Sequence, residues 1–177
     1  MNKKLLSTVG ILIIVILIII AISSKKPDAP ESSATDYRNI SYEIDGEIIK
    51  LAQGKAETEA APGSVSKIST ELYSGNEARA DLNNDGTEDI VFLLFQDGGG
   101  TGTFYYVAAA LSSGGTYKGT NAILLGDRIA PQTTEIRDGK IIINYADRKP
   151  DEPFSEQPSV GTSKYLKVEG QKLVEVK

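Results

Sequence analysis

The sequence predicts a mainly β fold, a β-sandwich or a small open barrel, that follows one N-terminal transmembrane helix. A continuous apolar run occupies residues 5–22, and beyond residue 38 apolar and polar residues alternate, as they do in half-buried strands. Turn pairs such as Asp45-Gly46 separate these alternating segments. The 177 residues leave room for one globular domain after the apolar run, and no second domain is expected.

The segment Leu5–Ile22 predicts a membrane anchor. It is uncharged and consists almost wholly of Ile, Leu, Val and Ala. At a rise of about 1.5 Å per residue, a helix of this length spans about 27 Å, close to the hydrocarbon thickness of a bilayer. A cleaved signal peptide is the alternative, because two lysines precede the run and Ala21-Ile22-Ser23 at its end has the small-x-small pattern of a cleavage site. The run is longer than the roughly 7–15 apolar residues of a signal peptide, which favours retention.

The anchor divides the chain into a cytoplasmic tail (residues 1–4), the transmembrane span (5–22), a linker (23–37) and an extracytoplasmic domain (38–177). Two lysines flank the span on each side, so the positive-inside rule does not choose its orientation. A tail of four residues favours the signal-anchor arrangement, with the short end inside the cell and the long domain outside. The linker is rich in Ser, Pro, Ala and charged residues, as spacers are.

The start of the chain also resembles a type IV pilin or pseudopilin, because a basic leader and Gly10 precede the long apolar segment. Those families place a Glu five residues after the processing Gly, where this chain has Val15. They also place an aromatic residue directly after the Gly, where this chain has Ile11. A pseudopilin-like subunit is therefore kept as an alternative.

The composition excludes several kinds of site. Lys plus Arg total 19 and Asp plus Glu total 24, and four of the lysines flank the anchor, so residues from 27 onward carry 15 basic and 24 acidic side chains, a balance of −9. A domain this acidic repels phosphate backbones, so we expect no nucleic-acid binding. The chain has no Cys and no His. Their absence excludes disulfides, Cys or His nucleophiles, and thiolate or imidazole metal sites.

Three hairpins are predicted from their turns. Asp45-Gly46 and Asp138-Gly139 are pairs that type I′ turns favour, because both central residues need positive φ, and Gly170-Gln171 marks a looser turn. Further strands are expected at 67–73, 89–96, 103–111 and 121–125, which gives nine or ten strands in all. Two of these strands are apolar on both faces, so we expect them to be central and covered on both sides; the apolar stretches are Phe92–Phe95 and Tyr105–Ala110.

Residues 81–89 read DLNNDGTED and predict a structural Ca²⁺ site. Alternate positions of a coiled loop supply oxygen ligands, and Gly86 permits the sharp turn. The position that holds a bidentate Glu in an EF-hand is Phe92 here. The loop therefore resembles the shorter DxDxDGxxD loops of integrin-type FG-GAP repeats, which lie between strands and bind calcium structurally. The expected ligands are Asp81, Asn83, Asp85, Thr87 and Asp89.

The alternative for this loop is a turn that binds no ion, because Asn, Asp and Gly are also favoured turn residues. Three carboxylates imply a weak site, with a dissociation constant of about 10⁻⁴ to 10⁻³ M. Such a site is filled outside a cell and largely empty in the cytosol. The loop therefore agrees with an extracytoplasmic domain.

Weaker patterns suggest other chemistry. The Gly-rich run 97–103 lacks the Lys-Ser/Thr ending of a phosphate-binding P-loop, so a hairpin loop is the better interpretation. Ser64 and Lys67 have the spacing of a Ser-Lys catalytic pair but lie in a loop that enters a strand. The Asp-Arg pairs at 127–128 and 147–148 each follow a strand, and are interpreted either as ion pairs that anchor loops or as part of a polar binding rim.

Three further stretches, read with the Asp81–Asp89 loop, resemble a family of uncharacterised bacterial envelope proteins. They are GGGTGTFYYVAAAL, NAILLGDRIAPQTTEIRDGKIIINYADRKPDEP and QPSVGTSKYLKV. The resemblance covers roughly residues 39–172. Members of that family pair this domain with a lipid or helix anchor, or with lysozyme-inhibitor-like modules. The resemblance implies an envelope location and no established activity.

These observations together predict a non-enzymatic, calcium-stabilised domain at the cell membrane that binds a protein or glycan of the cell envelope. We expect no catalytic residues and no organic cofactor. A carboxylate-dependent hydrolase of cell-wall glycans is kept as an alternative, because carboxylates are plentiful, although no spacing marks out an acid/base pair.

Overall fold

The computed structural model describes residues 35–177, which form a mainly β domain. The expected tail, the transmembrane anchor and all but the end of the linker fall on residues 1–34, outside the described residues. Within residues 35–177, no helix is long and apolar enough to cross a membrane. The mainly β fold class is confirmed, and the anchor stays a prediction.

One short 3-10 turn and twelve strands make up the secondary structure of the described residues. They are η1 (Tyr37–Asn39), β1 (Ser41–Ile44), β2 (Glu47–Lys50), β3 (Lys55–Glu59), β4 (Lys67–Ala80), β5 (Asp89–Asp97), β6 (Thr103–Ser113), β7 (Thr116–Gly119), β8 (Ile123–Asp127), β9 (Ala130–Arg137), β10 (Lys140–Asp147), β11 (Val160–Glu169) and β12 (Lys172–Glu175). Strands β3 and β7 escape prediction because KAETE and TYKG carry too few apolar residues to show a pattern.

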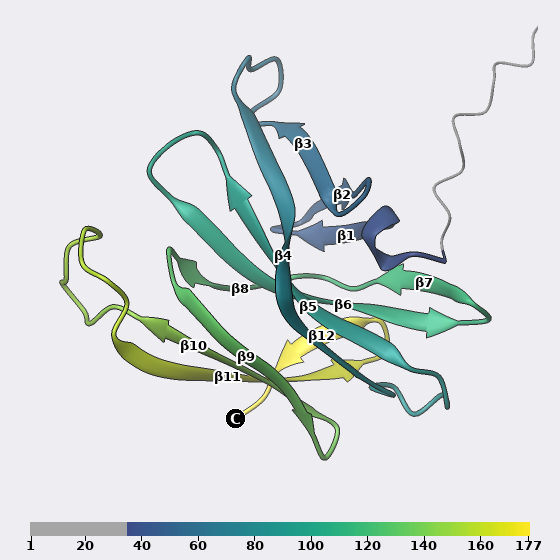
Figure 1. Ribbon diagram of the computed structural model, residues 1–177. Coiled ribbons are helices and arrows are strands. Elements are labelled where there is room, and N and C mark those ends of the chain that lie inside the picture. Colours follow the sequence, from purple (N-terminus) through teal and green to yellow (C-terminus); the bar gives the residue numbers. More distant parts are fainter. Residues whose placement is uncertain (1–34) are drawn as a thin grey trace, which may run out of the picture. The chain divides into compact units, whose positions relative to one another are not determined.

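The strands form three antiparallel sheets. The central sheet has the order β3-β4-β5-β6-β7, with β8 also paired to β6. A second sheet has the order β12-β11-β10-β9, and β1 and β2 form a separate hairpin. Figure 1 shows the hairpin above the central sheet and the β9–β12 sheet below it. The central sheet is therefore covered on both faces.

Two hydrophobic cores lie on opposite faces of the central sheet. Val91, Leu93 and Val107 point to the core shared with the β9–β12 sheet, where they meet Ile141 and Ile143. Because side chains alternate across a strand, the neighbouring residues point the other way. They pack under the hairpin in a second core that includes Ile44, Ile49, Phe92, Leu94 and Tyr106.

This arrangement confirms that β5 and β6 are central strands. Phe92 and Val107 are completely buried. Phe95 and Tyr105 are only half-buried, and their ring centroids lie 6.1 Å apart near the end of the strands.

All three predicted hairpin turns are present. Asp45 and Gly46 have φ values of 50° and 85°, and Asp138 and Gly139 have values of 52° and 72°. These are the positive φ values that a type I′ turn requires. Gly170, at φ 61°, opens the third turn, between β11 and β12.

Strand β4 is longer than predicted, because it continues through residues 74–77 to Ala80. This stretch reads SGNE, which resembles a turn, and the register with β5 shifts across it. Gly75 adopts φ 87°, and the side chain of Asn76 is buried and accepts a hydrogen bond from Thr134 (2.8 Å) on β9. The hydrogen bond between Thr134 and Asn76 thus joins the two large sheets and stabilises the irregular segment.

Residues 120–122 join all three sheets. The backbone of Thr120 and Ala122 pairs with Glu43 of β1 (3.2 and 2.7 Å), while Thr120 also bonds to the backbone of Ala109 in β6. The side chain of Asn121 makes two hydrogen bonds to the backbone of Leu173 in β12. This three-residue segment therefore fixes the hairpin and the second sheet onto the central sheet.

Candidate functional site

The Asp81–Asp89 loop connects β4 to β5, and all five expected calcium ligands lie in it. Asn84 (φ 60°) and Gly86 (φ 84°) both adopt left-handed backbone conformations. They turn the chain sharply, as the role predicted for Gly86 requires. The loop is therefore tightly coiled between two strands.

The exposed side chains of the loop accept hydrogen bonds from its own backbone. Asp81 accepts from the N–H groups of Asp85 (3.1 Å) and Gly86 (2.9 Å), and Asn83 accepts from Asp85 (3.0 Å). Asp85 accepts from the N–H of Thr87 (2.8 Å) and from the amide of Asn83 (2.9 Å). The hydroxyl of Thr87 is also bonded to Asp85, and with the Asn83 amide it holds the pKa of that carboxyl below its usual value.

Asp89 is the buried member of the set, with no exposed surface. Its two oxygens accept backbone hydrogen bonds from Leu82 (2.9 Å) and from Ser112 (2.7 Å) at the end of β6. Burial raises the pKa of Asp89, the two backbone donors oppose this rise, and the negative charges of Asp85 and Asp81 add to it. Asp89 is thus a buried carboxylate next to two others.

The arrangement falls short of a formed metal centre. Among residues 35–177, no three acidic side chains converge closely enough to hold a metal ion as they stand. Asp81 and Asp85 accept bonds from the backbone, and Asp89 faces Leu82 and Ser112. A cation would have to draw the carboxylates of Asp81 and Asp85 away from some of these donors. The calcium assignment stays a prediction.

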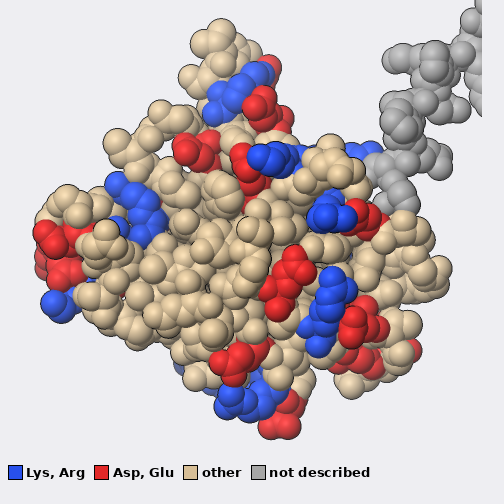
Figure 2. All heavy atoms as spheres, in the orientation of Figure 1, with Lys and Arg blue, Asp and Glu red and all other residues tan. Residues whose placement is uncertain are grey.

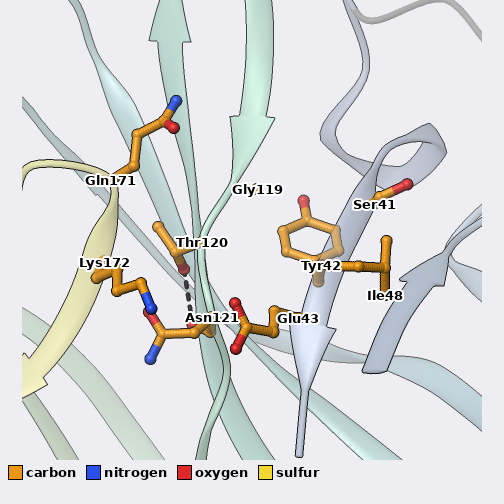
Figure 3. Close-up of a pocket in the computed structure, with 9 residues that line it drawn as sticks. All are labelled: Ser41, Tyr42, Glu43, Ile48, Gly119, Thr120, Asn121, Gln171 and Lys172. Carbon is orange, nitrogen blue, oxygen red and sulfur yellow. Dashed lines mark hydrogen bonds between the residues drawn. The ribbon is translucent and has the colours of Figure 1, made fainter. Parts of the chain in front are cut away.

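A small hollow of 180 Å³ lies at the junction of the three sheets (Figure 3). Figure 3 shows Tyr42 and Glu43 of β1 on one side, Gln171 and Lys172 on the other, and Thr120 between them. No local sequence pattern predicts this hollow, because its walls come from three segments far apart in the chain. Glu43 is the one carboxylate that lines it, so this hollow does not supply the carboxylate pair of a glycan hydrolase.

A larger and more apolar groove of 340 Å³ lies beyond the tip of the β1–β2 hairpin. Phe104 and Leu124 line it and are 43% and 44% exposed. Sequence reasoning missed this groove, because alternation shows which face of a strand a residue occupies but not how far the covering layer extends. The remaining lining residues are Asp45, Ile68, Gln96, Gly98 and Tyr106.

The Asp-Arg pairs anchor loops, in two different ways. Arg128 forms an ion pair with Asp127 (2.8 Å), and its guanidinium carbon lies 3.8 Å from the centroid of the Phe154 ring. Arg148 donates instead to the carbonyl oxygens of Arg128 (2.9 Å) and Glu156 (2.7 Å). These contacts tie the connection between β10 and β11 to the end of β8.

The two remaining sequence patterns lack the contacts their chemistry needs. Lys67 forms an ion pair with Glu59 (3.4 Å), and the hydroxyl of Ser64 accepts from the backbone of Ser66 (3.1 Å). No hydrogen bond joins Ser64 to Lys67 within residues 35–177. The Gly-rich run joins β5 to β6 as a hairpin loop, in which Asp97 accepts from the N–H of Gly99 (2.7 Å).

The charged side chains of the described surface are mixed in sign. Figure 2 shows Lys and Arg beside Asp and Glu on the face drawn, with no continuous basic stripe. Lys55 pairs with Glu71 (2.7 Å), and Arg79 lies 3.7 Å from Glu77.

Comparisons of the chain with protein-family models, curated proteins and solved structures find no match.

Proposed function

We propose that this chain is a non-enzymatic binding protein of the cell envelope, anchored in the membrane by residues 5–22 and stabilised by Ca²⁺ in the Asp81–Asp89 loop. In this proposal the two large sheets form a β-sandwich, and the sandwich carries a binding surface for an envelope protein or glycan.

The proposed calcium site rests on one observation, the burial of Asp89 next to two other carboxylates. Its exposed fraction is 0%, and the charges of Asp81 and Asp85 raise its pKa further. A divalent cation relieves this repulsion and favours the ionised form of all three groups. Asn83 and Thr87 lie in the same loop and supply neutral oxygen atoms, which suit the oxygen preference of Ca²⁺.

Thermal melting of the full chain in a neutral detergent tests this proposal. We expect millimolar Ca²⁺ to raise the melting temperature relative to a chelator, and Mg²⁺ to raise it less. Asp85→Asn should abolish the calcium effect, since Asn keeps the hydrogen bond to Thr87 but removes the charge. Asp97→Asn, which changes a similar turn outside the loop, is the matched control. A melting temperature that does not respond to Ca²⁺ contradicts the proposal.

The location is tested separately from the metal. Intact cells treated with external protease should lose the domain if it lies outside the membrane, and should retain it if it lies in the cytosol. The mass of the mature N-terminus distinguishes the alternatives at the anchor: an uncut signal-anchor begins at residue 1 or 2, a pseudopilin-like subunit begins at Ile11, and a cleaved signal peptide leaves a chain that begins after Ser23.

The partner is tested by capture from envelope extracts, with the full chain as bait, in the presence of calcium and of a chelator. A specific protein or glycan retained by the wild type supports a binding role. Turnover of a cell-wall glycan by the purified chain contradicts the non-enzymatic assignment.

A further inference from the structure

The groove beyond the β1–β2 hairpin exists because the hairpin is shorter than the sheet it covers. Strands β1 and β2 have four residues each, whereas β5 and β6 have nine and eleven. The hairpin buries Phe92 and Leu94 and turns back at Asp45-Gly46. In Figure 1 the far ends of β5 and β8 extend past it. The same face of the sheet continues there without a cover.

The floor of the groove is a row of side chains from four neighbouring strands. Ile68 of β4, Gln96 of β5, Phe104 of β6 and Leu124 of β8 line it together. Three of the four are apolar, and Phe104 and Leu124 are each more than two-fifths exposed. At 340 Å³ the groove has the volume of a small-ligand site, which is typically about 300–1,000 Å³.

The carboxylate of Asp45 is the one charged group among the groove's lining residues, and an ionised carboxylate only accepts hydrogen bonds. The hydroxyl of Tyr106 donates to one oxygen of Asp45 (2.8 Å), and the amide nitrogen of Gln96 donates to Thr70 (3.0 Å). Within residues 35–177, the second carboxylate oxygen of Asp45 makes no hydrogen bond or ion pair, whereas the amide of Gln96 keeps both an N–H and its carbonyl oxygen for a ligand. An ammonium group, which donates and does not accept, matches Asp45.

The charge around the groove has one sign. An adjoining hollow of 190 Å³ shares Asp45, Ile68 and Gln96 with the groove and adds Glu47 and Glu59. No Lys or Arg lines either space, and of the three carboxylates only Glu59 is paired, with Lys67 (3.4 Å). Asp45 and Glu47 are therefore negative groups at an apolar surface, without a cation among the described residues.

From these contacts we propose that the groove binds a small organic cation, in which an ammonium group meets Asp45 and an apolar or aromatic body lies on Phe104, Leu124 and Ile68. The Phe104 ring is 43% exposed, and an aromatic ring can attract both an apolar body and a positive charge. The inference does not depend on the calcium loop, which lies between β4 and β5 and shares no residue with the groove.

Methyl NMR of the full chain tests this inference, with Ile and Leu methyl groups labelled, in a neutral maltoside detergent and with a chelator present. The probe is phenethylammonium. We expect saturable shifts of the Ile68 and Leu124 methyl signals and none at Leu173, which lies in the other core. The uncharged analogue 2-phenylethanol and the anion 3-phenylpropionate should bind much more weakly.

Asp45→Asn should weaken the binding of phenethylammonium about two- to fivefold, the size expected for an ion pair at an exposed carboxylate. Asn is favoured in the same turn and still accepts the hydrogen bond of Tyr106, so the fold is retained. Asp138→Asn, at the equivalent position of another type I′ turn, is the matched control and should leave affinity unchanged. Phe104→Ala should also weaken binding.

Four results would overturn the inference. They are no saturable shift at Ile68 and Leu124, equal affinity for 2-phenylethanol, equal affinity for 3-phenylpropionate, and unchanged affinity in Asp45→Asn. Because the chelator is present throughout, each result is independent of whether the Asp81–Asp89 loop binds calcium.

Discussion

The side-chain amide of Asn121 bonds to both backbone groups of Leu173, as the backbone of a neighbouring strand would. Leu173 donates its N–H to the amide oxygen of Asn121 (2.9 Å) and accepts from the amide nitrogen (3.1 Å). This is the pair of bonds that a neighbouring backbone would make in a sheet. The side chain of Leu173 is 2% exposed, so the contact holds β12 over the core between the two large sheets.

Asn121→Ala should destabilise the domain by about 1–3 kcal/mol, because it leaves the N–H and C=O of Leu173 without their partner. Chemical denaturation measures the loss. Asn144→Ala is the matched control: its amide nitrogen donates to the side chains of Thr133 (2.8 Å) and Glu135 (3.2 Å), and its oxygen accepts from the hydroxyl of Ser163 (2.6 Å). Water can replace these side-chain partners at the surface, so we expect a smaller cost of about 0.5 kcal/mol. Equal losses in the two variants would argue against the role assigned to Asn121.

Gly119→Ala should be among the most damaging single changes in the domain. A Cβ at Gly119 would lie 2.1 Å from the carbonyl oxygen of Ser41 and 2.7 Å from the ring of Tyr42, and neither can move freely. We expect a loss of about 3 kcal/mol or more, measured by the denaturation midpoint. Gly161→Ala in β11 is the control, since a Cβ there meets nothing within 4 Å. A Gly119→Ala protein as stable as Gly161→Ala would contradict the close approach of β1.

The pKa of Asp89 should lie above its usual value, and ¹³C carboxyl titration by NMR measures it directly. Because the folded pKa is raised, the folded state binds this proton more tightly than the unfolded state. The contribution of Asp89 to stability therefore falls as the pH rises from the unfolded pKa through the folded one. Asp85→Asn should lower the pKa of Asp89 by removing a neighbouring negative charge, and Asp97→Asn should leave it unchanged.

Arg148→Ala should loosen the connection between β10 and β11. The substitution removes the bonds to the carbonyl oxygens of Arg128 and Glu156, so the amide of Ser159, which bonds to Asp147 at 2.9 Å, should exchange its hydrogen faster. We expect an increase of about tenfold, which corresponds to the loss of one charge-assisted hydrogen bond. Arg137→Ala, which breaks only the exposed pair with Glu135 (2.6 Å), should not change this rate.

Much of the fold was predictable because its signals are local. An Asp-Gly pair requires positive φ wherever it stands, so the turns at Asp45 and Asp138 were predicted correctly. Residues that are apolar on both faces of a strand, such as those around Phe92, need two covering layers whichever elements supply them. These rules need no knowledge of distant parts of the chain.

The rest depends on distant contacts. The residues SGNE resemble a turn in the sequence. In the structure they lie within β4, where Asn76 accepts a hydrogen bond from Thr134 of another sheet. The groove at Phe104 depends on where the hairpin stops, and the role of Asn121 depends on Leu173, which lies far along the chain. For the Asp81–Asp89 loop, the sequence predicted the sharp turn at Gly86 (φ 84°), but it could not show that Asp89 accepts hydrogen bonds from the backbone of Leu82 and Ser112.

The two-sided burial of β5 and β6 has a consequence for the order in which the domain is completed during synthesis. The hairpin that covers one face precedes these strands in the chain, and the β9–β12 sheet that covers the other face follows them. A nascent chain that ends before β9 would therefore expose the apolar row that contains Val91, Leu93 and Val107. Exposed strands of this composition self-associate. A chain truncated before β9 should therefore aggregate rather than fold as a smaller domain.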